Sequence, residues 1–301
     1  MTNDRAILIL DGATGTELDR RGVDVSSKAW SARAIRDAPD VLKQIHEEYL
    51  RAGAGAITAN TFRTNERSVD ASDLKGAAKL LTREAVQIAM AARDRVQPNA
   101  LVFGSVAPLE DCYEPHRAPK PDVCRAEHAQ QIERLLDAGV DGILIETMNV
   151  QREALAAAQA AQDLAMGKWM ISFCTLAEGP PDTLLSGQPL TDVLPQLDGA
   201  AAVGINCIAA PAVAPHVSLL RALLPENVEV MAYGNIGRIE PSGQWVQTDA
   251  VSPERYLAYA QQWREAGATI IGGCCGTRPE TIAALAQELG PTRLAGEDST
   301  T

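Results

Sequence analysis

The sequence has few aromatic residues, few histidines and no long apolar runs. Aromatic residues make up 4% of the 301 positions although 46% are apolar, so the core must consist mainly of small aliphatic side chains, many of them alanine, packed against helices. No apolar stretch approaches the roughly 18 residues that cross a bilayer, and the first residues lack the apolar segment of a secretion signal. We therefore expect a cytoplasmic globular protein.

Positive charge is also scarce, with a formal net charge of −12. Nucleic acids and anionic membranes would have to bind against this field, so we exclude both as partners and expect small-molecule substrates. Six cysteines in a chain without a signal segment indicate metal-bound or free thiols rather than a disulfide framework. The four histidines lack the spacing of metal ligands, and His46 and His128 fall within helical patterns.

Eight short apolar runs alternate with amphipathic, alanine-rich segments. The pattern predicts strands near residues 7–10, 56–59, 101–106, 142–145, 169–173, 202–205, 228–232 and 269–271. It predicts helices near residues 40–52, 75–96, 122–138, 150–166, 189–197, 212–224, 253–266 and 279–289. Eight βα units in a chain of this length predict an α/β protein with one (β/α)8 TIM-barrel domain over residues 1–290 and a polar C-terminal tail over residues 291–301.

Three similar Ala-Gly segments end predicted helices, at residues 51–57, 137–143 and 265–271. Glycine just past a helix end accepts a left-handed conformation, so the same corner is expected before three of the strands. Longer insertions follow strands one, three, five and seven, among them residues 108–121 and 177–187. These insertions are expected on the face where barrel enzymes place their chemistry.

Adjacent cysteines, Cys274 and Cys275, follow an apolar run and are flanked by glycines. Neighbouring side chains on a regular strand point to opposite faces, so both sulfurs reach one ion only where the backbone leaves the pleat. Cys207 ends another apolar run. Three thiolates that leave one tetrahedral position open suit a catalytic zinc ion.

Polar residues interrupt the apolar pattern at seven of the eight predicted strand ends: Asp11, Asn60, Ser105, Glu146, Cys207, Asn235 and the Cys274-Cys275 pair. The predicted topology brings the thiols to either side of Asn235, which we expect to occupy or guard the fourth metal position. Other interpretations stay open: Glu146 could pair with Arg152 or cap a helix, Asp11 could form a turn, and Asn60, Ser105 and Asn235 could satisfy loop backbone groups. Cys174 ends strand five without motif support.

Six segments together resemble the homocysteine S-methyltransferase family over nearly the whole chain: Asp-Gly-Ala-Thr-Gly-Thr-Glu-Leu (11–18), Ala-Asn-Thr-Phe (59–62), Gly-Ser-Val-Ala-Pro (104–108), Glu-Thr-Met (146–148), Gly-Ile-Asn-Cys (204–207) and Gly-Gly-Cys-Cys-Gly-Thr (272–277). The family includes enzymes that use S-methylmethionine or betaine and the homocysteine-binding part of methionine synthases. The resemblance implies a (β/α)8 barrel, Zn²⁺ held by Cys207, Cys274 and Cys275, and methyl transfer to homocysteine to give methionine. It also implies that Glu146 and Asp11 hold the amino-acid part of homocysteine.

These residue types suit that chemistry. Coordination to zinc deprotonates a thiol that is mostly protonated when free at neutral pH. Glu146 can accept hydrogen bonds from the substrate ammonium, and the amides of the Gly12-Ala13-Thr14-Gly15 turn can hold its carboxylate. The same turn lacks the third glycine of a dinucleotide fingerprint, so a nucleotide site is not expected.

Four aromatic residues are expected in or beside the top-face loops: Trp30, Phe62, Tyr113 and Tyr233. Aromatic faces attract sulfonium and quaternary ammonium groups, which favours a small onium donor of the S-methylmethionine or betaine type, although packing is the preferred interpretation of Trp30 and Tyr233. The sequence departs from common family members at Tyr-Gly-Asn (233–235) and in the insertion at 108–115. Two alternatives therefore stay open: a methyl-corrinoid protein as donor, or a non-enzymatic thiol or metal sensor.

Overall fold

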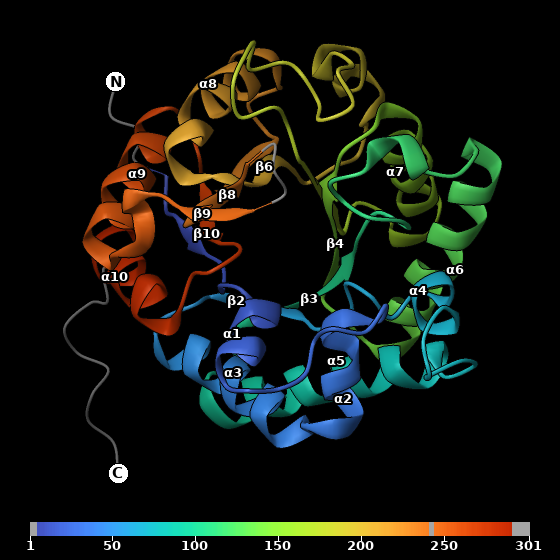
Figure 1. The fold of residues 1–301 in the computed structure, drawn as a ribbon. Helices are drawn as coiled ribbons and strands as arrows, with labels where there is room; N and C mark the ends of the chain where they lie inside the picture. Colours follow the sequence, from blue (N-terminus) through green and yellow to red (C-terminus); the bar gives the residue numbers. More distant parts are fainter. Residues whose placement is uncertain (1–4, 241–243, 291–301) are drawn as a thin grey trace.

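The structure, a computed structural model, describes residues 5–240 and 244–290, and it is a (β/α)8 barrel (Figure 1). The eight barrel strands are β1 (Leu8–Ile9), β2 (Ala56–Ala59), β3 (Leu101–Val106), β4 (Gly142–Met148), β5 (Trp169–Phe173), β6 (Ala202–Ala209), β7 (Glu229–Asn235) and β10 (Ile270–Gly273). All neighbours pair in parallel in the order β1-β10-β7-β6-β5-β4-β3-β2. A parallel bridge between Leu10 and Ala56 brings β1 back to β2. The predicted fold and all eight strands are confirmed.

A ring of helices covers the barrel: α3 (Pro39–Arg51), α5 (Ala78–Val96), α6 (Pro121–Ala138), α7 (Gln151–Ala165), α8 (Val213–Leu223), α9 (Pro253–Glu265) and α10 (Pro279–Leu289). Shorter helices lie in the connections: α1 (Thr14–Arg20) and α2 (Ala34–Asp37) after β1, and α4 (Glu66–Asp70) after β2. None of the described helices has the length and apolar character needed to cross a bilayer. The predicted tail at residues 291–301 lies outside the described residues.

The helix predicted at residues 189–197 is wrong. Two separate 3₁₀ turns, Leu190–Asp192 and Leu194–Gln196, occupy this segment. Pro195 is the reason: proline has no N–H to donate to the carbonyl four residues earlier, and its ring clashes with that carbonyl. Seven long helices therefore surround eight strands among the described residues.

An antiparallel hairpin that the sequence pattern did not predict follows β7 and is formed by β8 (Gly237–Ile239) and β9 (Trp245–Gln247). In Figure 1 the hairpin crosses the end of the barrel beside β10. The signal that could have found it is the Pro-Ser-Gly sequence at positions 241–243, because such residues commonly separate the strands of a hairpin.

Two packed layers form the core. Leu10, Phe103, Met231 and their neighbours fill the inside of the barrel, while a larger cluster of aliphatic and alanine side chains lies between strands and helices. Gly53, Gly139 and Gly267 have positive φ at the three predicted Ala-Gly corners. These corners lie at the end of the barrel where the strands begin. Barrel enzymes have their active sites at the opposite end, where the strands end.

Candidate metal centre and substrate pocket

The sulfur atoms of Cys207, Cys274 and Cys275 all lie within 4.8 Å of one another, and none of the three cysteines is in a disulfide. The distance between the sulfurs of Cys207 and Cys275 is 3.9 Å. Thiolates that share one tetrahedral zinc at bond lengths near 2.3 Å have sulfurs about 3.8 Å apart. The Cys207–Cys275 separation therefore matches that of two thiolates on one metal ion, and the three thiols together are a candidate metal site.

Local backbone geometry explains why these sulfurs converge. β10 ends at Gly273, so Cys274 and Cys275 lie in a turn outside the pleat, as the glycine pattern predicted. The turn is held by hydrogen bonds from the Cys274 amide to the Gly234 carbonyl, at 2.9 Å, and from the Cys275 amide to Oδ1 of Asn235, at 3.0 Å. Two adjacent side chains can therefore face one point.

Cys207 reaches the same point through a bulge in β6. Between Asn206 and Ala209 this strand has one more residue than the facing part of β7, and Cys207 has a φ of 59°. A left-handed conformation is uncommon for a residue other than glycine, and bulges often re-aim side chains beside active sites. In the absence of a metal, the pKa of Cys207 is raised well above its usual value by contact with Cys274 and by burial.

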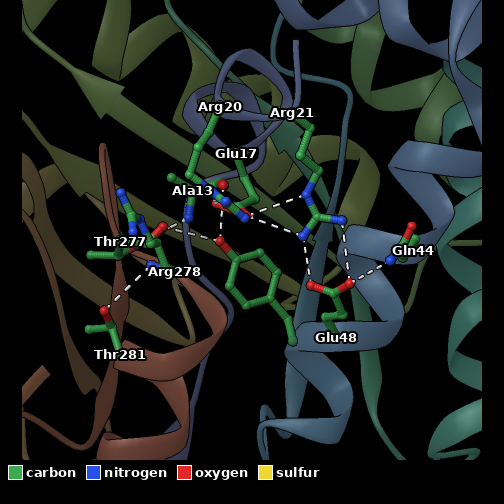
Figure 2. A network of polar contacts seen from close by, with 10 residues as sticks. Ala13, Glu17, Arg20, Arg21, Gln44, Glu48, Thr277, Arg278 and Thr281 are labelled. Atoms are coloured by element: carbon green, nitrogen blue, oxygen red, sulfur yellow. Dashed lines mark hydrogen bonds and ion pairs between the residues drawn. The ribbon is translucent and has the colours of Figure 1, made fainter. Parts of the chain in front are cut away.

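The turn that carries Cys274 is tied to the turn after Asp11. The Ala13 amide donates to Oγ1 of Thr277 at 3.2 Å, and the hydroxyl of buried Tyr49 donates to the carbonyls of Ala13 and Thr277. Figure 2 shows this junction, with Ala13 and Thr277 facing each other across the network. A Cβ at Gly12 would lie 2.8 Å from the Tyr49 ring, so glycine is required here for packing.

Two carboxylates, buried Asp11 and half-buried Glu146, line the same cavity as the three thiols. The Asp11 carboxylate accepts hydrogen bonds from the amide and hydroxyl of Thr58, and burial raises its pKa to about 8. Glu146 accepts a hydrogen bond from Ser105, and burial raises its pKa to about 7. Because desolvation penalises the charged form, both carboxylates would gain from a bound cation.

The structure does not support the alternative roles considered for these acids. Arg152 donates to the backbone carbonyls of Pro119 and Ala118 rather than to Glu146. Asp11 contacts Thr58 on the neighbouring strand rather than the residues of its own turn.

One cavity of about 780 Å³ is lined by all but one of the predicted site residues: Asp11, Gly12, Asn60, Ser105, Glu146, Cys207, Cys274, Cys275, Trp30, Phe62, Tyr113 and Tyr233. Asn235 does not line it. Its Oδ1 is taken by the Cys275 amide, and its Nδ2 lies 4.0 Å from the Cys207 sulfur. Asn60 is also partly occupied, because its side chain both accepts from and donates to Ser31.

The four aromatic residues fall into different surroundings. Tyr233 belongs to the cluster inside the barrel, and its hydroxyl contacts Ser172. Trp30, the first residue of the 3₁₀ turn Trp30–Arg33, packs edge to face with Phe62 in the loop after β2, with ring centroids 5.7 Å apart. Tyr113, in the insertion after β3, places its hydroxyl 3.1 Å from the Cys207 sulfur.

Asn206 is a site residue that sequence reasoning missed, although it stands in the Gly-Ile-Asn-Cys motif. It is fully buried, accepts a hydrogen bond from the Thr147 amide at 2.9 Å and donates one to the Thr147 hydroxyl at 2.8 Å. Thr147 has a φ of 63° and lies in a bulge of β4. Asn206 therefore links the bulge beside Glu146 to the bulge that aims Cys207.

A TIM barrel with three thiols and two carboxylates around one cavity at its strand ends defines the class: a barrel protein with a candidate thiolate metal centre beside a small-molecule pocket. The family model described as homocysteine S-methyltransferase matches residues 8–289. The chain belongs to the homocysteine S-methyltransferase family and is a methyltransferase.

Individual relatives agree with this assignment. The chain is 33% identical to the homocysteine S-methyltransferase of Escherichia coli, over 93% of this chain and 94% of that protein, and 31% identical to homocysteine S-methyltransferase YbgG of Bacillus subtilis, over 93% of each. It is 29% identical to a selenocysteine methyltransferase of Astragalus bisulcatus, over 91% of this chain and 90% of that one. The metallated form of E. coli homocysteine methyltransferase MmuM superposes with a TM-score of 0.78 at 31% identity, over 95% of this chain and 97% of that one.

Proposed function

We propose that this chain transfers a methyl group from a small onium donor to the thiol of homocysteine, and that Cys207, Cys274 and Cys275 hold the Zn²⁺ that activates this thiol. The convergence of the three sulfurs within 4.8 Å carries the proposal. The metallated form reported for the E. coli relative supports a metal in this family. When bound, zinc supplies a Lewis acid that keeps the acceptor thiol ionised at neutral pH.

The chain's own residues orient the acceptor. Glu146 accepts hydrogen bonds from its ammonium group with Ser105 beside it, and Asp11, which lines the same cavity, ionises more readily once this cation is bound. The amides near Gly12 face the carboxylate. Asn235 guards the metal centre rather than ligating it, since its Oδ1 is held by the Cys275 amide and its amide nitrogen faces the Cys207 sulfur.

Methyl transfer is a single in-line displacement. The acceptor sulfur forms a bond to the methyl carbon while the bond from that carbon to the donor's onium atom breaks, and the bonding pair stays on the departing thioether or amine. The proton of the acceptor thiol passes to solvent before this step, so no acid or base touches the methyl group. Trp30 and Tyr113 stabilise the onium charge and exclude water, so the protein acts mainly by positioning.

Metal content and turnover test the proposal together. Protein purified without chelator should contain about one zinc per chain and form methionine from homocysteine with S-methylmethionine or a betaine, measured by mass spectrometry. Cys275→Ser should lose both zinc and turnover, whereas Cys124→Ser, which changes a buried thiol outside the cavity, should keep both.

Each failure has a distinct meaning. Full activity of Cys275→Ser would refute the thiolate site. Methyl transfer only from a methyl-corrinoid protein would refute the onium donor. A reversible response of the thiols to oxidant, without methionine formation, would replace the enzyme with a thiol sensor.

A further inference from the structure

Four cationic side chains line the cavity: Lys28, Arg63, Arg67 and Arg117. Two of them form ion pairs with carboxylates, and two do not. Arg67 pairs with Glu110 and Glu127, and Arg117 pairs with Glu110 and Glu114. Among the described residues, no carboxylate pairs with Arg63 or Lys28. Arg63 and Lys28 are therefore the two cations of the cavity whose charge no ion pair among the described residues neutralises.

Arg63 is held in place by contacts that leave one edge of its guanidinium group free. Its Nη1 donates to the carbonyls of Pro108 and Glu110, both at 2.9 Å, and its guanidinium carbon lies 5.1 Å from the centroid of the Phe62 ring. Its Nε and Nη2 have no hydrogen-bond partner among the described residues. These two nitrogens form the planar fork that binds a carboxylate through two parallel hydrogen bonds.

Arg63 is linked through its neighbours to Trp30 and Tyr113, the residues proposed to bind the onium group of the donor. The loop whose carbonyls hold Arg63 continues to Tyr113, whose hydroxyl lies 3.1 Å from the Cys207 sulfur. Phe62, which stacks with Arg63, packs against Trp30. Because Phe62 already contacts one cation, its ring serves to orient Arg63. The onium group of the donor would therefore bind against Trp30 and Tyr113.

We propose that Arg63 is a specificity-determining residue whose free guanidinium edge binds a carboxylate of the methyl donor. The inference rests on the proposed function and deepens it: it assigns the residue that binds the carboxylate which S-methylmethionine and betaine both carry. Lys28 adds long-range attraction without a fixed geometry, since its side chain is exposed. Asp111, which also lines the cavity, opposes this attraction, although its Oδ1 accepts a hydrogen bond from the Tyr113 amide.

The test compares S-methylmethionine with its methyl ester, which keeps the sulfonium group and loses the carboxylate charge. A charge-assisted hydrogen-bonded contact contributes about 1.5 to 3 kcal/mol, so wild-type protein should show a KM for the ester about 10-fold to 150-fold higher than for the acid. Arg63→Gln should raise the KM for the acid by a similar factor and leave the ester unchanged. The preference for the acid would then disappear, while the KM for homocysteine stays constant.

Two further variants separate a binding role from a structural one. Arg63→Lys keeps the charge without the fork, so it should retain only part of the preference for the acid. Arg117→Gln removes the same charge from the same cavity at a residue that is already paired, so it should change the preference for the acid less than threefold, because its charge is already compensated. If Arg63 only anchors the insertion, Arg63→Gln will weaken both donors equally, which overturns the inference.

The outcomes also distinguish this inference from the proposed function. If wild-type protein uses both donors with equal KM, the onium mechanism stands and the role of Arg63 is refuted. If it uses neither donor, the proposed donor class is wrong and the inference falls with it.

Discussion

Replacing Asn206 by alanine should weaken both the fold and homocysteine binding. The side chain is fully buried and makes three hydrogen bonds of 2.8 to 2.9 Å, two with Thr147 and one accepted from the Ser172 hydroxyl. At about 1 kcal/mol each, their loss lowers the free energy of unfolding by about 3 kcal/mol. The strained Thr147 backbone also loses its support, so Glu146 and Cys207 shift, and the KM for homocysteine should rise at least about tenfold.

Urea unfolding and steady-state kinetics measure the two effects separately. Thr269→Val is the matched control, because this hydroxyl contacts Glu229 and the Val230 amide at the start of the strands, at the opposite end of the barrel. It should cost about 1 to 2 kcal/mol of stability while homocysteine KM stays unchanged. An Asn206→Ala variant within 1 kcal/mol of wild type, with unaltered KM, would show that this side chain does not hold the two bulges in place.

Three further changes have defined outcomes. Gly15→Ala places a Cβ 2.1 Å from the Trp30 ring, so the KM for the methyl donor should rise by more than that for homocysteine; equal changes would argue against a donor role for Trp30. Burial lowers the pKa of His46 to about 4, so between its unfolded value of 6.5 and pH 4 the unfolded state binds the extra proton and stability falls with acidification. His46→Leu should remove this loss and exceed wild type by about 2 kcal/mol at pH 5 in urea unfolding, and an unchanged pH slope would contradict the assignment. Chelation of the metal should abolish methionine formation yet preserve the far-ultraviolet circular dichroism spectrum, since the barrel core forms without the thiols; cooperative unfolding on chelation would refute this.

Much of the fold could be predicted because its signals are local. Each barrel strand is a short apolar run, and glycine marks three of the corners between helices and strands. The thiol trio was also predictable, since the carboxyl ends of parallel strands meet at one face of a barrel. The helix predicted at residues 189–197 is wrong because the apolar periodicity of this segment is helical, whereas Pro195 prevents a continuous helix.

The parts of the site that could not be predicted depend on contacts between distant segments. Thr147 and Cys207 adopt left-handed conformations without a glycine to signal them. The free edge of Arg63 exists only because the insertion after β3 returns to contact its Nη1. Similarly, Asn235 becomes a partner of the Cys275 amide only when β7 and β10 are neighbours.

Thr147 and Cys207 are two of the four described non-glycine residues with positive φ, and both lie beside the candidate site. Such a conformation costs roughly 1 to 2 kcal/mol at a residue with a Cβ, and more crowding is expected for the β-branched Thr147. Each lies where its strand has one residue more than its neighbour, beside Glu146 in β4 and at the thiol in β6. A regular strand would send consecutive side chains to alternate faces from these points onward. The bulges therefore set the directions of the Glu146 carboxylate and of the Cys207 thiol, a candidate metal ligand, and one buried amide, Asn206, couples them.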